Sequence, residues 1–585
     1  MRLLSPPGSR RYALAVLASA AALPGSASLA TAQQAEAPVA IVAMPATTLP
    51  RTHAPAPTSP AITAADLMTR LYIFADDSMM GREAGTPGNV KGTDYIAAQV
   101  ARMGLRPAGD NGTFFQTIPF RRRGIDPASR IVLNGATLHP GTDWAILPGS
   151  PAPTGALPLV YGGVIGDGSA RLTPVQAAGK LVVYRVLPAG IPLLQQPGTY
   201  PAGLAGVLFT GLDPYIGFLA RPATILDDPA TPSGTLPVPA ILMASEAADN
   251  AFTAPLSALA PGAEGRTGTF EVRITMAPVE APARNVVAIL RGSDASVAGE
   301  YVAVGAHNDH IGMSSHPVDH DSIRILNHLV RPGGAEDEAR QPTPAQQGAV
   351  NAELAAWRAA HPGTARPDSI SNGADDDGSG SVSVLEIAEK LAALPRAPRR
   401  SILFVWHVGE EKGLLGSQYY TDHPTVTRDS IVAQLNIDMV GRGDAWDVTG
   451  QTKDGTPIHG GPDYLQLIGS RRLSSELGAL VEAVNRDGHH GLALDYSLDA
   501  NGHPMNIYCR SDHYEYARYG IPITFFTTGG HSDYHQVTDE PQYIDYPHMA
   551  RVANLVEQVV ERVANLDHRI VVDQPKPDPH GSCRQ

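Results

Sequence analysis

The sequence predicts an α/β fold: a mixed, mostly parallel sheet flanked by helices, into which a β-rich domain is inserted. After residue 282, runs typical of buried strands alternate with amphipathic helical segments, which is the pattern of a layered α/β sheet. Residues 126–282 instead contain few charges and several short β-type runs separated by Gly and Pro, which indicates a β-rich module. Helical segments precede this module, so the α/β domain is expected at residues 61–125 and 283–567.

The first 60 residues resemble an export segment followed by a tether. Arg2, Arg10 and Arg11 precede an apolar run, and small residues at 30–32 follow it, which is the order of a secretory signal peptide at residues 1–32. The run is too short to span a bilayer comfortably, so we expect an exported protein, periplasmic or secreted, without a stable membrane anchor. Residues 33–60 are rich in Ala and Pro and are expected to form a tether.

Helical and strand patterns then define the elements in order. Thr63 is expected to cap a helix at 63–77, and Gly104 to end a second helix at 89–104. The strands expected in the inserted module lie at 156–163, 180–186, 206–211 and 237–244. The later elements are strands at 283–290, 300–307, 401–408 and 431–440, and helices at 381–394 and 549–566. Residues 568–585 form a tail.

One long connection fits neither pattern. Residues 313–371 are polar and charged, with one helical segment at 349–361. Connections of this length are usually functional lids or surface excursions. Because this one separates motifs with metal-ligand residues, we expect it to emerge near them and to shape a substrate entrance; an inert surface loop is the alternative.

Composition excludes several classes of function. The formal net charge is 44 − 58 = −14 and no basic block stands out, so nucleic acid is not an expected partner. The two cysteines, Cys509 and Cys583, could pair or stay free. They are too few for a zinc site made of thiolates.

Acids and imidazoles follow apolar runs at five places. These are His307 with Asp309, the aspartates 375–377, Glu410 with Glu411, Asp438, and His531 with His535. Each of these alone has an ordinary structural interpretation, such as a turn, a helix cap or a solvated loop. The carboxyl ends of parallel strands converge at one edge of a sheet, however, so these residues can meet in one pocket.

Together these residues have the composition of a site for two cations. Two histidines, a glutamate and two aspartates can hold two divalent ions with one bridging carboxylate, and nitrogen and oxygen donors suit Zn²⁺, with Co²⁺ or Mn²⁺ as substitutes. Adjacent acids such as Glu410 and Glu411 cannot easily point at one metal. One of them can bind an ion while the other carries a proton, which is the arrangement needed to hydrolyse an amide.

With these motifs in this order, the sequence resembles the M28 family of dinuclear zinc peptidases, the aminopeptidase and glutamate-carboxypeptidase group. The resemblance covers about 61–125 and 283–565. It implies two Zn²⁺ ions held by His307, Asp376, Glu411, Asp438 and His535. It also implies that Glu410 is the general base, that Asp309 orients His307, and that the peptide bond after Asp376 is cis. His535 is preferred over His531 because of the motif "YHQVTDEP".

Two further segments carry weaker expectations. Ser511 or Asp512 is expected to cap a short helix at 513–520; the alternative is that it faces the pocket. His310 has no role that the family assigns. The inserted module resembles a protease-associated domain in "AGKLVVYRV" and "AGLAGVLFTG", a type of insert that borders the cleft in related enzymes.

The resemblance leaves four functions open. The first is an aminopeptidase acting on peptides with a free N-terminus, because acids around the metals can hold an α-amine. A carboxypeptidase or dipeptidase would need a cation for the substrate carboxylate, and Arg442 and Arg510 lie near the motifs. A one-zinc glutaminyl cyclase is opposed by the inserted module. A binding module without activity is opposed by the complete set of site residues. The oligomeric state is not predicted.

Overall fold

The computed structural model describes residues 49–167, 172–187, 194, 200–229, 238–337, 341–362 and 366–585. The signal peptide predicted at 1–32 and the first part of the tether lie outside these residues. The described part of the tether contains no helix or strand through residue 60, although Thr58 accepts a hydrogen bond from Arg70 at 3.1 Å.

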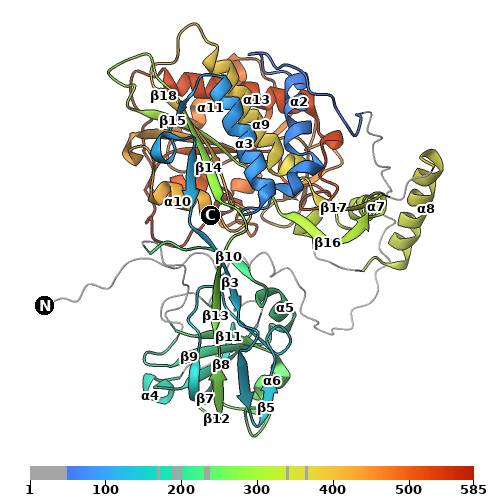
Figure 1. Cartoon of the computed structure of the whole chain (residues 1–585), viewed down its shortest axis with the longest axis vertical. Coiled ribbons are helices and arrows are strands. Elements are labelled where there is room, and N and C mark those ends of the chain that lie inside the picture. The colour runs from blue at the N-terminus through green and yellow to red at the C-terminus, as the bar shows by residue number, and fades with distance from the viewer. Residues whose placement is uncertain are drawn as a thin grey trace, which may run out of the picture. The chain divides into compact units, whose positions relative to one another are not determined.

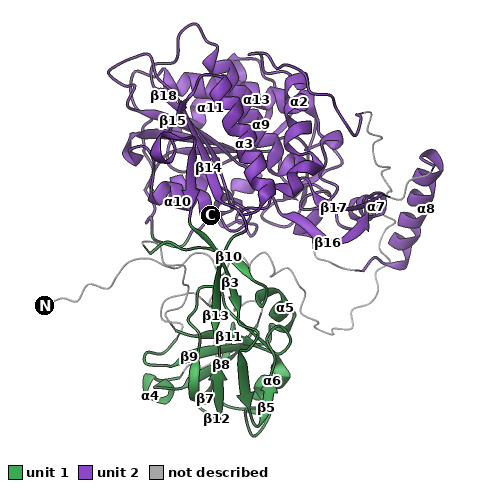
Figure 2. Ribbon diagram, in the orientation of Figure 1, with its two compact units in different colours: residues 1–31, 119–279, 580–582 green, residues 32–118, 280–579, 583–585 purple. Residues whose placement is uncertain are grey.

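The described chain forms two compact units (Figure 2). The β-rich unit contains Pro119–Val279 and His580–Ser582. The α/β unit contains the other described residues. The ends expected for the inserted module, residues 126 and 282, fall near the ends of Pro119–Val279.

The α/β unit is built on a mixed sheet whose strands β14, β15 and β18 are labelled in Figure 1. The strand order is β1-β14-β18-β15-β19-β24-β22-β23, and β2 pairs with β14. Its strands are β1 (Arg106–Pro107), β2 (Phe115–Ile118), β14 (Ala283–Leu290), β15 (Tyr301–His307), β18 (Ser401–His407), β19 (Ile431–Ile437), β22 (Tyr464–Ile468), β23 (Ala493–Asp495) and β24 (Ile523–Thr527). The four central strands β18, β15, β19 and β24 are parallel, whereas β14 and β22 run antiparallel to their inner neighbours. The α/β sheet predicted from the sequence is confirmed.

Helices cover both faces of this sheet. One face packs against α2 (Ala64–Phe74), α3 (Pro87–Arg102), α9 (Gly380–Ala392), α11 (Ser475–Asp487) and α13 (Tyr546–Ala564), and the other against α10 (Leu415–Asp422) and α12 (His513–Ala517). Successive residues of a strand face opposite sides, so Val286 and Ala288 join the first core while Val287 joins the second. Thr63 caps α2 as predicted, by accepting a hydrogen bond from the Asp66 amide.

The β-rich unit contains an eight-stranded and a three-stranded sheet. Its elements are β3 (Phe120–Ile125), β4 (Arg130–Leu133), β5 (Ala136–Leu138), β6 (Trp144–Ile146), β7 (Thr154–Ile165), α4 (Pro174–Ala177), β8 (Leu181–Val186), β9 (Gly206–Thr210), α5 (Ile216–Leu219), β10 (Ala223–Leu226), β11 (Ala240–Met243), α6 (Ser245–Asp249), β12 (Glu264–Glu271) and β13 (Ile274–Pro278). The four strands predicted here coincide with β7, β8, β9 and β11. Its likeness to a protease-associated domain stays a prediction.

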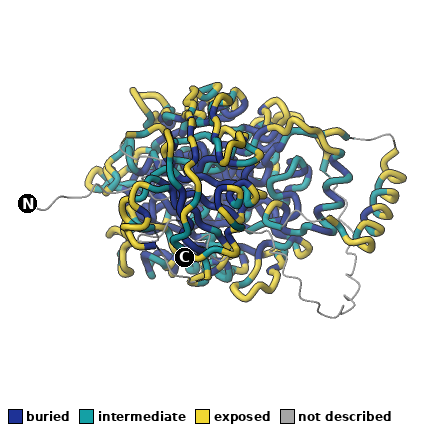
Figure 3. The backbone as a smooth tube through the Cα atoms, turned by 90° about the horizontal axis from the view of Figure 1, so that it is seen from below, coloured by how far each residue is buried: buried dark blue, intermediate teal, exposed yellow. Residues whose placement is uncertain are grey.

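The connection at 313–371 is more structured than its polarity suggested. It begins and ends in a hairpin of β16 (Gly312–Asp319) and β17 (Pro367–Ser371), and it carries α7 (His320–Val330) and α8 (Pro344–Ala360). The expected helix at 349–361 is part of α8, which is exposed along most of its length (Figure 3). The helix α7 was missed, although its apolar residues follow a helical spacing and pack against α8 around Ile325, Val330 and Val350.

The remaining small hairpin pairs β20 (Val448–Gln451) with β21 (Pro457–His459). Among the described helices, none is both long and apolar enough to cross a membrane.

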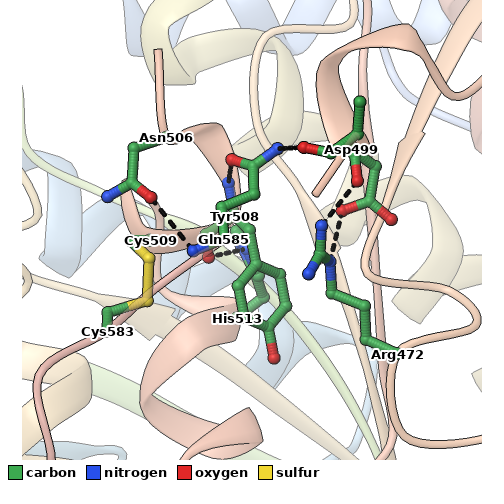
Figure 4. The surroundings of a disulfide bond; sticks show 9 residues. Arg472, Asp499, Asn506, Tyr508, Cys509, His513, Cys583 and Gln585 are labelled. Carbon is green, nitrogen blue, oxygen red and sulfur yellow. Dashed lines mark hydrogen bonds and ion pairs between the residues drawn. A yellow bond between two sulfur atoms is a disulfide. The ribbon is translucent and has the colours of Figure 1, made fainter. Parts of the chain in front are cut away.

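Cys509 and Cys583 form a disulfide, which settles the alternative that the sequence left open (Figure 4). The bond joins the turn before α12 to the last residues of the chain. Gln585 adds hydrogen bonds there, accepting from the Tyr508 amide at 3.0 Å and donating to the carbonyl of Leu498. The segment that follows the turn leads directly into the site described below.

Reducing this disulfide should destabilise the protein. The bond spans a sequence separation of 74 residues. Removing a cross-link of that length costs about 4 kcal/mol in the chain-entropy account. We therefore expect a lower midpoint of denaturant unfolding in the presence of dithiothreitol. The chain has two cysteines, so a variant with both replaced by serine is the control: its midpoint should not respond to the reductant. Equal midpoints for oxidised and reduced wild type would contradict the expectation.

Candidate metal centre

The four central parallel strands end at one edge of the sheet, and predicted site residues follow each of them. His307 is the last residue of β15, and Asp309 lies two residues later. Glu410 and Glu411 follow β18, Asp438 follows β19 directly, and His535 lies in the loop after β24. The edge rule for parallel sheets thus brings residues that are distant in sequence to one place.

Asp376 reaches this edge from the loop before α9. The Asp376–Asp377 peptide bond is cis, as the family resemblance implied. Of the three consecutive aspartates, Asp375 and Asp377 bind backbone amides: Asp375 accepts from Gly441 at 2.6 Å and Asp377 from His307 at 2.9 Å. Asp376 alone of the three contacts both His307 and His535 with its carboxylate.

Two groups of donor atoms share the carboxylate of Asp376. In the first group, Nε2 of His307 lies 3.0 Å from Oδ1 of Asp376 and 3.6 Å from Oδ1 of Asp438. In the second, Nε2 of His535 lies 2.9 Å from Oδ2 of Asp376 and 3.0 Å from Oε2 of Glu411. The structure therefore brings all five predicted ligands together, with one oxygen of Asp376 facing each group.

His310 belongs to the second group and was not assigned a role from the sequence. Its Nδ1 lies 2.8 Å from Oε1 of Glu411 and 3.6 Å from Oδ2 of Asp376, and its ring packs edge-on against His535. The available signal was its place in "HNDH", three residues after His307. That signal was weak, because a histidine after a strand is usually structural.

Several of the donor atoms are buried and lack hydrogen-bond partners, which is the test of whether cations fit. Nε2 of His307, both ring nitrogens of His310, Oε1 of Glu411 and Oδ1 of Asp438 are buried and make no hydrogen bond. Buried polar atoms are normally satisfied, so a set of such atoms converging on two points requires an explanation. Imidazole nitrogens and carboxylate oxygens are donors that Zn²⁺ accepts, and the residues present fit such ions.

The electrostatics of the pocket favour positive charge. Burial alone would lower the pKa of His307, but the carboxylates of Asp438 and Asp376 outweigh it and hold that pKa well above its usual value. The pKa of His535 is likewise raised despite burial, because Glu411 and Asp376 face it. Burial would raise the pKa of Asp376, yet its contacts with His307 and His535 hold it well below its usual value. The carboxylates thus hold cationic partners in a buried place.

Glu410 stands beside both groups and belongs to neither. The charges of His307, Glu411 and Asp438 all act on its carboxyl group. Burial raises the pKa of Glu410 well above its usual value, the charge of His307 opposes the shift, and that of Glu411 adds to it. A carboxyl group next to the donor atoms but not among them is placed to carry a proton.

Asp309 touches both the ring of His307 and the loop of Glu410. Its backbone carbonyl lies 3.0 Å from Nδ1 of His307, while its carboxylate is 3.8 Å from the same nitrogen. That carboxylate accepts hydrogen bonds from the amides of Gly409 at 2.7 Å and Glu410 at 3.3 Å. Asp309 thus contacts the histidine mainly through its backbone, and its side chain fixes the turn that carries the two glutamates.

The expectation that Ser511 or Asp512 caps the short helix is wrong. Helix α12 begins without a side-chain cap, because Asp512 already adopts helical backbone angles. The hydroxyl of Ser511 instead donates to Oδ2 of Asp438 at 2.7 Å. Carboxylate ligands of metals are commonly held by such a hydrogen bond.

The two histidines that follow β24 have different partners. His531 lies 3.2 Å from Asp375, outside both donor groups, whereas His535 is in the second group. Both His535 and Met439, the residue after Asp438, adopt positive φ angles, of 56° and 59°. Such backbone conformations cost about 1–3 kcal/mol each and cluster at functional sites.

Two arginines near the site are held by hydrogen bonds or ion pairs within the protein. Arg82, buried, donates to the carbonyls of Asn372 and Gly373 and so supports the loop before Asp376. Arg442 is buried and binds Asp533 at 2.8 Å and Asp447 at 3.3 Å. Of the two arginines that could have received a substrate carboxylate, this one is held by two acids.

A third group, His320 with Asp368 and Glu540, lies in the base of the 313–371 connection. His320 contacts Asp368 at 3.0 Å and the hydroxyl of Tyr543 at 3.2 Å, and Arg366 neutralises Glu540 at 2.7 Å. These polar atoms satisfy one another, so the group is a hydrogen-bond network that fastens the connection to the loop after His535.

The chain is similar to known peptidases. Residues 356–560 match the model of peptidase family M28. Leucine aminopeptidase 1 of Ajellomyces capsulatus (strain H88) is 31% identical over 205 residues, covering 33% of this chain and 48% of that protein. Leupeptin-inactivating enzyme 1 of Streptomyces exfoliatus is 27% identical over 178 residues, covering 30% of this chain and 33% of that protein. The chain spans about a third to a half of the length of these relatives.

Solved structures are similar at low identity. An aminopeptidase from Aneurinibacillus sp. strain AM-1 has a TM-score of 0.47 and 17% identity, over 89% of this chain and 98% of that one. A zinc aminopeptidase from Bacillus subtilis has a TM-score of 0.43 and 17% identity, over 86% and 96%.

The segment that matches the family model contains four of the five predicted ligands, Asp376, Glu411, Asp438 and His535, together with Glu410. That match confirms the predicted resemblance to peptidase family M28 over residues 356–560.

Proposed function

We propose that this protein is an exported zinc-dependent aminopeptidase that removes N-terminal residues from peptides by hydrolysis, with two metal ions. The observation that carries the proposal is the carboxylate of Asp376, whose two oxygens face two separate groups of unsatisfied donors. When bound there, a pair of zinc ions would acidify a water molecule and polarise a carbonyl group.

The predicted site residues would have different roles in this reaction. His307 and Asp438 would hold one ion, His535 and Glu411 the other, and Asp376 both. Glu410 takes a proton from the attacking water and returns it to the leaving amine, which balances the proton over the reaction. Asp309 fixes the turn of Glu410 through two backbone amides. The surplus of carboxylates around the ligands suits a substrate that enters with a free, positively charged α-amine.

The activity is testable with purified protein. Zinc-loaded enzyme should release nitroaniline from aminoacyl-p-nitroanilides, should hydrolyse peptides with blocked carboxyl ends, and should not hydrolyse peptides with acetylated amino ends. A chelator should abolish release, and added Zn²⁺, Co²⁺ or Mn²⁺ should restore it. A preference for amino-blocked peptides over free ones would contradict the proposal and favour a carboxypeptidase.

A further inference from the structure

We propose that Glu336, in the 313–371 connection, determines the substrate class by pairing with Arg510. While it is paired, Arg510 cannot bind a free substrate carboxylate next to the scissile bond. The inference rests on the proposed function and deepens it: substrates are peptides that continue beyond their second residue, and dipeptides with a free carboxylate are disfavoured.

The pair itself is a two-pronged ion pair. Nη1 of Arg510 lies 3.1 Å from Oε2 of Glu336, and Nη2 contacts Oε1. Two parallel contacts of this kind use the planar fork of the guanidinium and orient it. About a third of each side chain is exposed, 34% for Arg510 and 31% for Glu336. The pair is therefore partly exposed to solvent, so a substrate could reach it.

Both residues adjoin the metal centre through their chain neighbours. Arg510 precedes Ser511, whose hydroxyl binds Asp438. Glu336 follows Ala335, whose amide donates to the carbonyl of Tyr534 at 3.1 Å, next to His535. The pair thus joins the segment that supports the first donor group to the loop that carries the second.

Electrostatic contacts agree with that location. Beyond their mutual attraction, Arg510 interacts with the charge of Glu410 and Glu336 with that of His535. Gly334 allows this approach. Its φ is +59°, and a Cβ there would lie 2.6 Å from the carbonyl oxygen of His531. The connection therefore needs glycine to bring Glu336 against the site.

Two other cations beside the site are also paired with acids. Arg442 binds Asp533 and Asp447, and Lys412 binds Glu83 at 2.9 Å. The Arg510 side chain is 34% exposed, against 6% for Arg442. Arg510 is therefore the arginine that the loss of one carboxylate would make available. The carboxylate that holds Arg510 is Glu336, which belongs to the 313–371 connection rather than to the α/β core.

The test compares Glu336→Gln with wild type on matched pairs of substrates. Each pair is a dipeptide and the same dipeptide with an amidated carboxyl end, and the readout is the ratio of their kcat/KM values. Freeing Arg510 should raise the ratio of acid to amide about tenfold or more, since a guanidinium–carboxylate contact is charge-assisted. The change should lie in KM for the acid rather than in kcat.

Two further variants separate this role from a general effect. Glu482 on α11 pairs with Arg471 at 2.8 Å, so Glu482→Gln also removes a carboxylate from an arginine pair and should leave the ratio unchanged. Adding Arg510→Gln to Glu336→Gln should return the ratio to the wild-type value. An unchanged ratio in Glu336→Gln, or a raised ratio that survives the loss of Arg510, would overturn the inference.

A binding measurement keeps the inference distinguishable from the proposed function. Calorimetry with the zinc-loaded protein would use dipeptides whose amide is reduced to CH₂–NH, as acid and as carboxamide. Glu336→Gln should gain about tenfold in affinity for the acid form alone. A wild type that cleaves none of the substrates would contradict the proposed function, while this titration would still decide the role of Glu336.

Discussion

Glu410→Gln should lower kcat by about 10²- to 10⁴-fold while the protein keeps its bound zinc. Glutamine has nearly the same shape but cannot accept the proton of the attacking water. Because the Glu410 carboxylate belongs to neither donor group, its loss removes no ligand. The measurements are kcat on an aminoacyl-p-nitroanilide and zinc per chain by mass spectrometry.

The neighbouring residue offers the matched control. Glu411→Gln is the same substitution one position later, but Glu411 contacts His535 and His310 in the second donor group. It should lose zinc as well as activity. If both variants keep their zinc, or if Glu410→Gln retains a tenth of the wild-type turnover, the division of roles between the two glutamates is wrong.

Asp376→Asn should remove activity by about 10³-fold or more, because ligand loss takes away both the acidified water and the polarised carbonyl. Its two carboxylate oxygens face separate donor groups, so one substitution weakens both proposed ions. Zinc per chain should fall below one. Thermal stability in excess zinc should also fall, because a ligand that binds only the folded state raises the free energy of unfolding.

Variants of single histidines test the two donor groups separately, with zinc per chain as the measurement. His307→Ala and His535→Ala each remove a donor from one group, so each should lose about one ion while Asp376→Asn loses both. Asp454→Asn, in an exposed turn, is the control for the loss of an aspartate and should match wild type. Full retention of zinc by Asp376→Asn would exclude a shared carboxylate.

Much of the fold was predictable because apolar strand segments and amphipathic helical segments alternate along the sequence. The strands at 300–307, 401–408 and 431–440 are mostly apolar and do not alternate, as expected of parallel strands covered on both faces. The helix α7 was missed because its polar residues outnumber its apolar ones, and its apolar residues pack against the exposed helix α8 rather than in the main core. The disulfide could not be decided, since two cysteines 74 residues apart carry no signal of proximity.

The candidate site was predictable where it depends on strand ends and less so where it depends on loops. The edge rule brings together His307, Glu411 and Asp438, whereas the choice of Asp376 over Asp375 came from the family resemblance. His310, the bond from Ser511 to Asp438, and the Glu336–Arg510 pair depend on how loops fold over the sheet edge. No local pattern in the sequence encodes those contacts.

The 313–371 connection begins shortly after β15, the strand that ends in His307, and it ends just before the loop of Asp376. Its small core around Ile325 and Val350 is separate from the two cores that position the strands. Mutations in the exposed helix α8 of this excursion can therefore accumulate without disturbing the metal residues. Diversification among descendants of such a chain would alter which peptides are accepted before it altered the chemistry of cleavage.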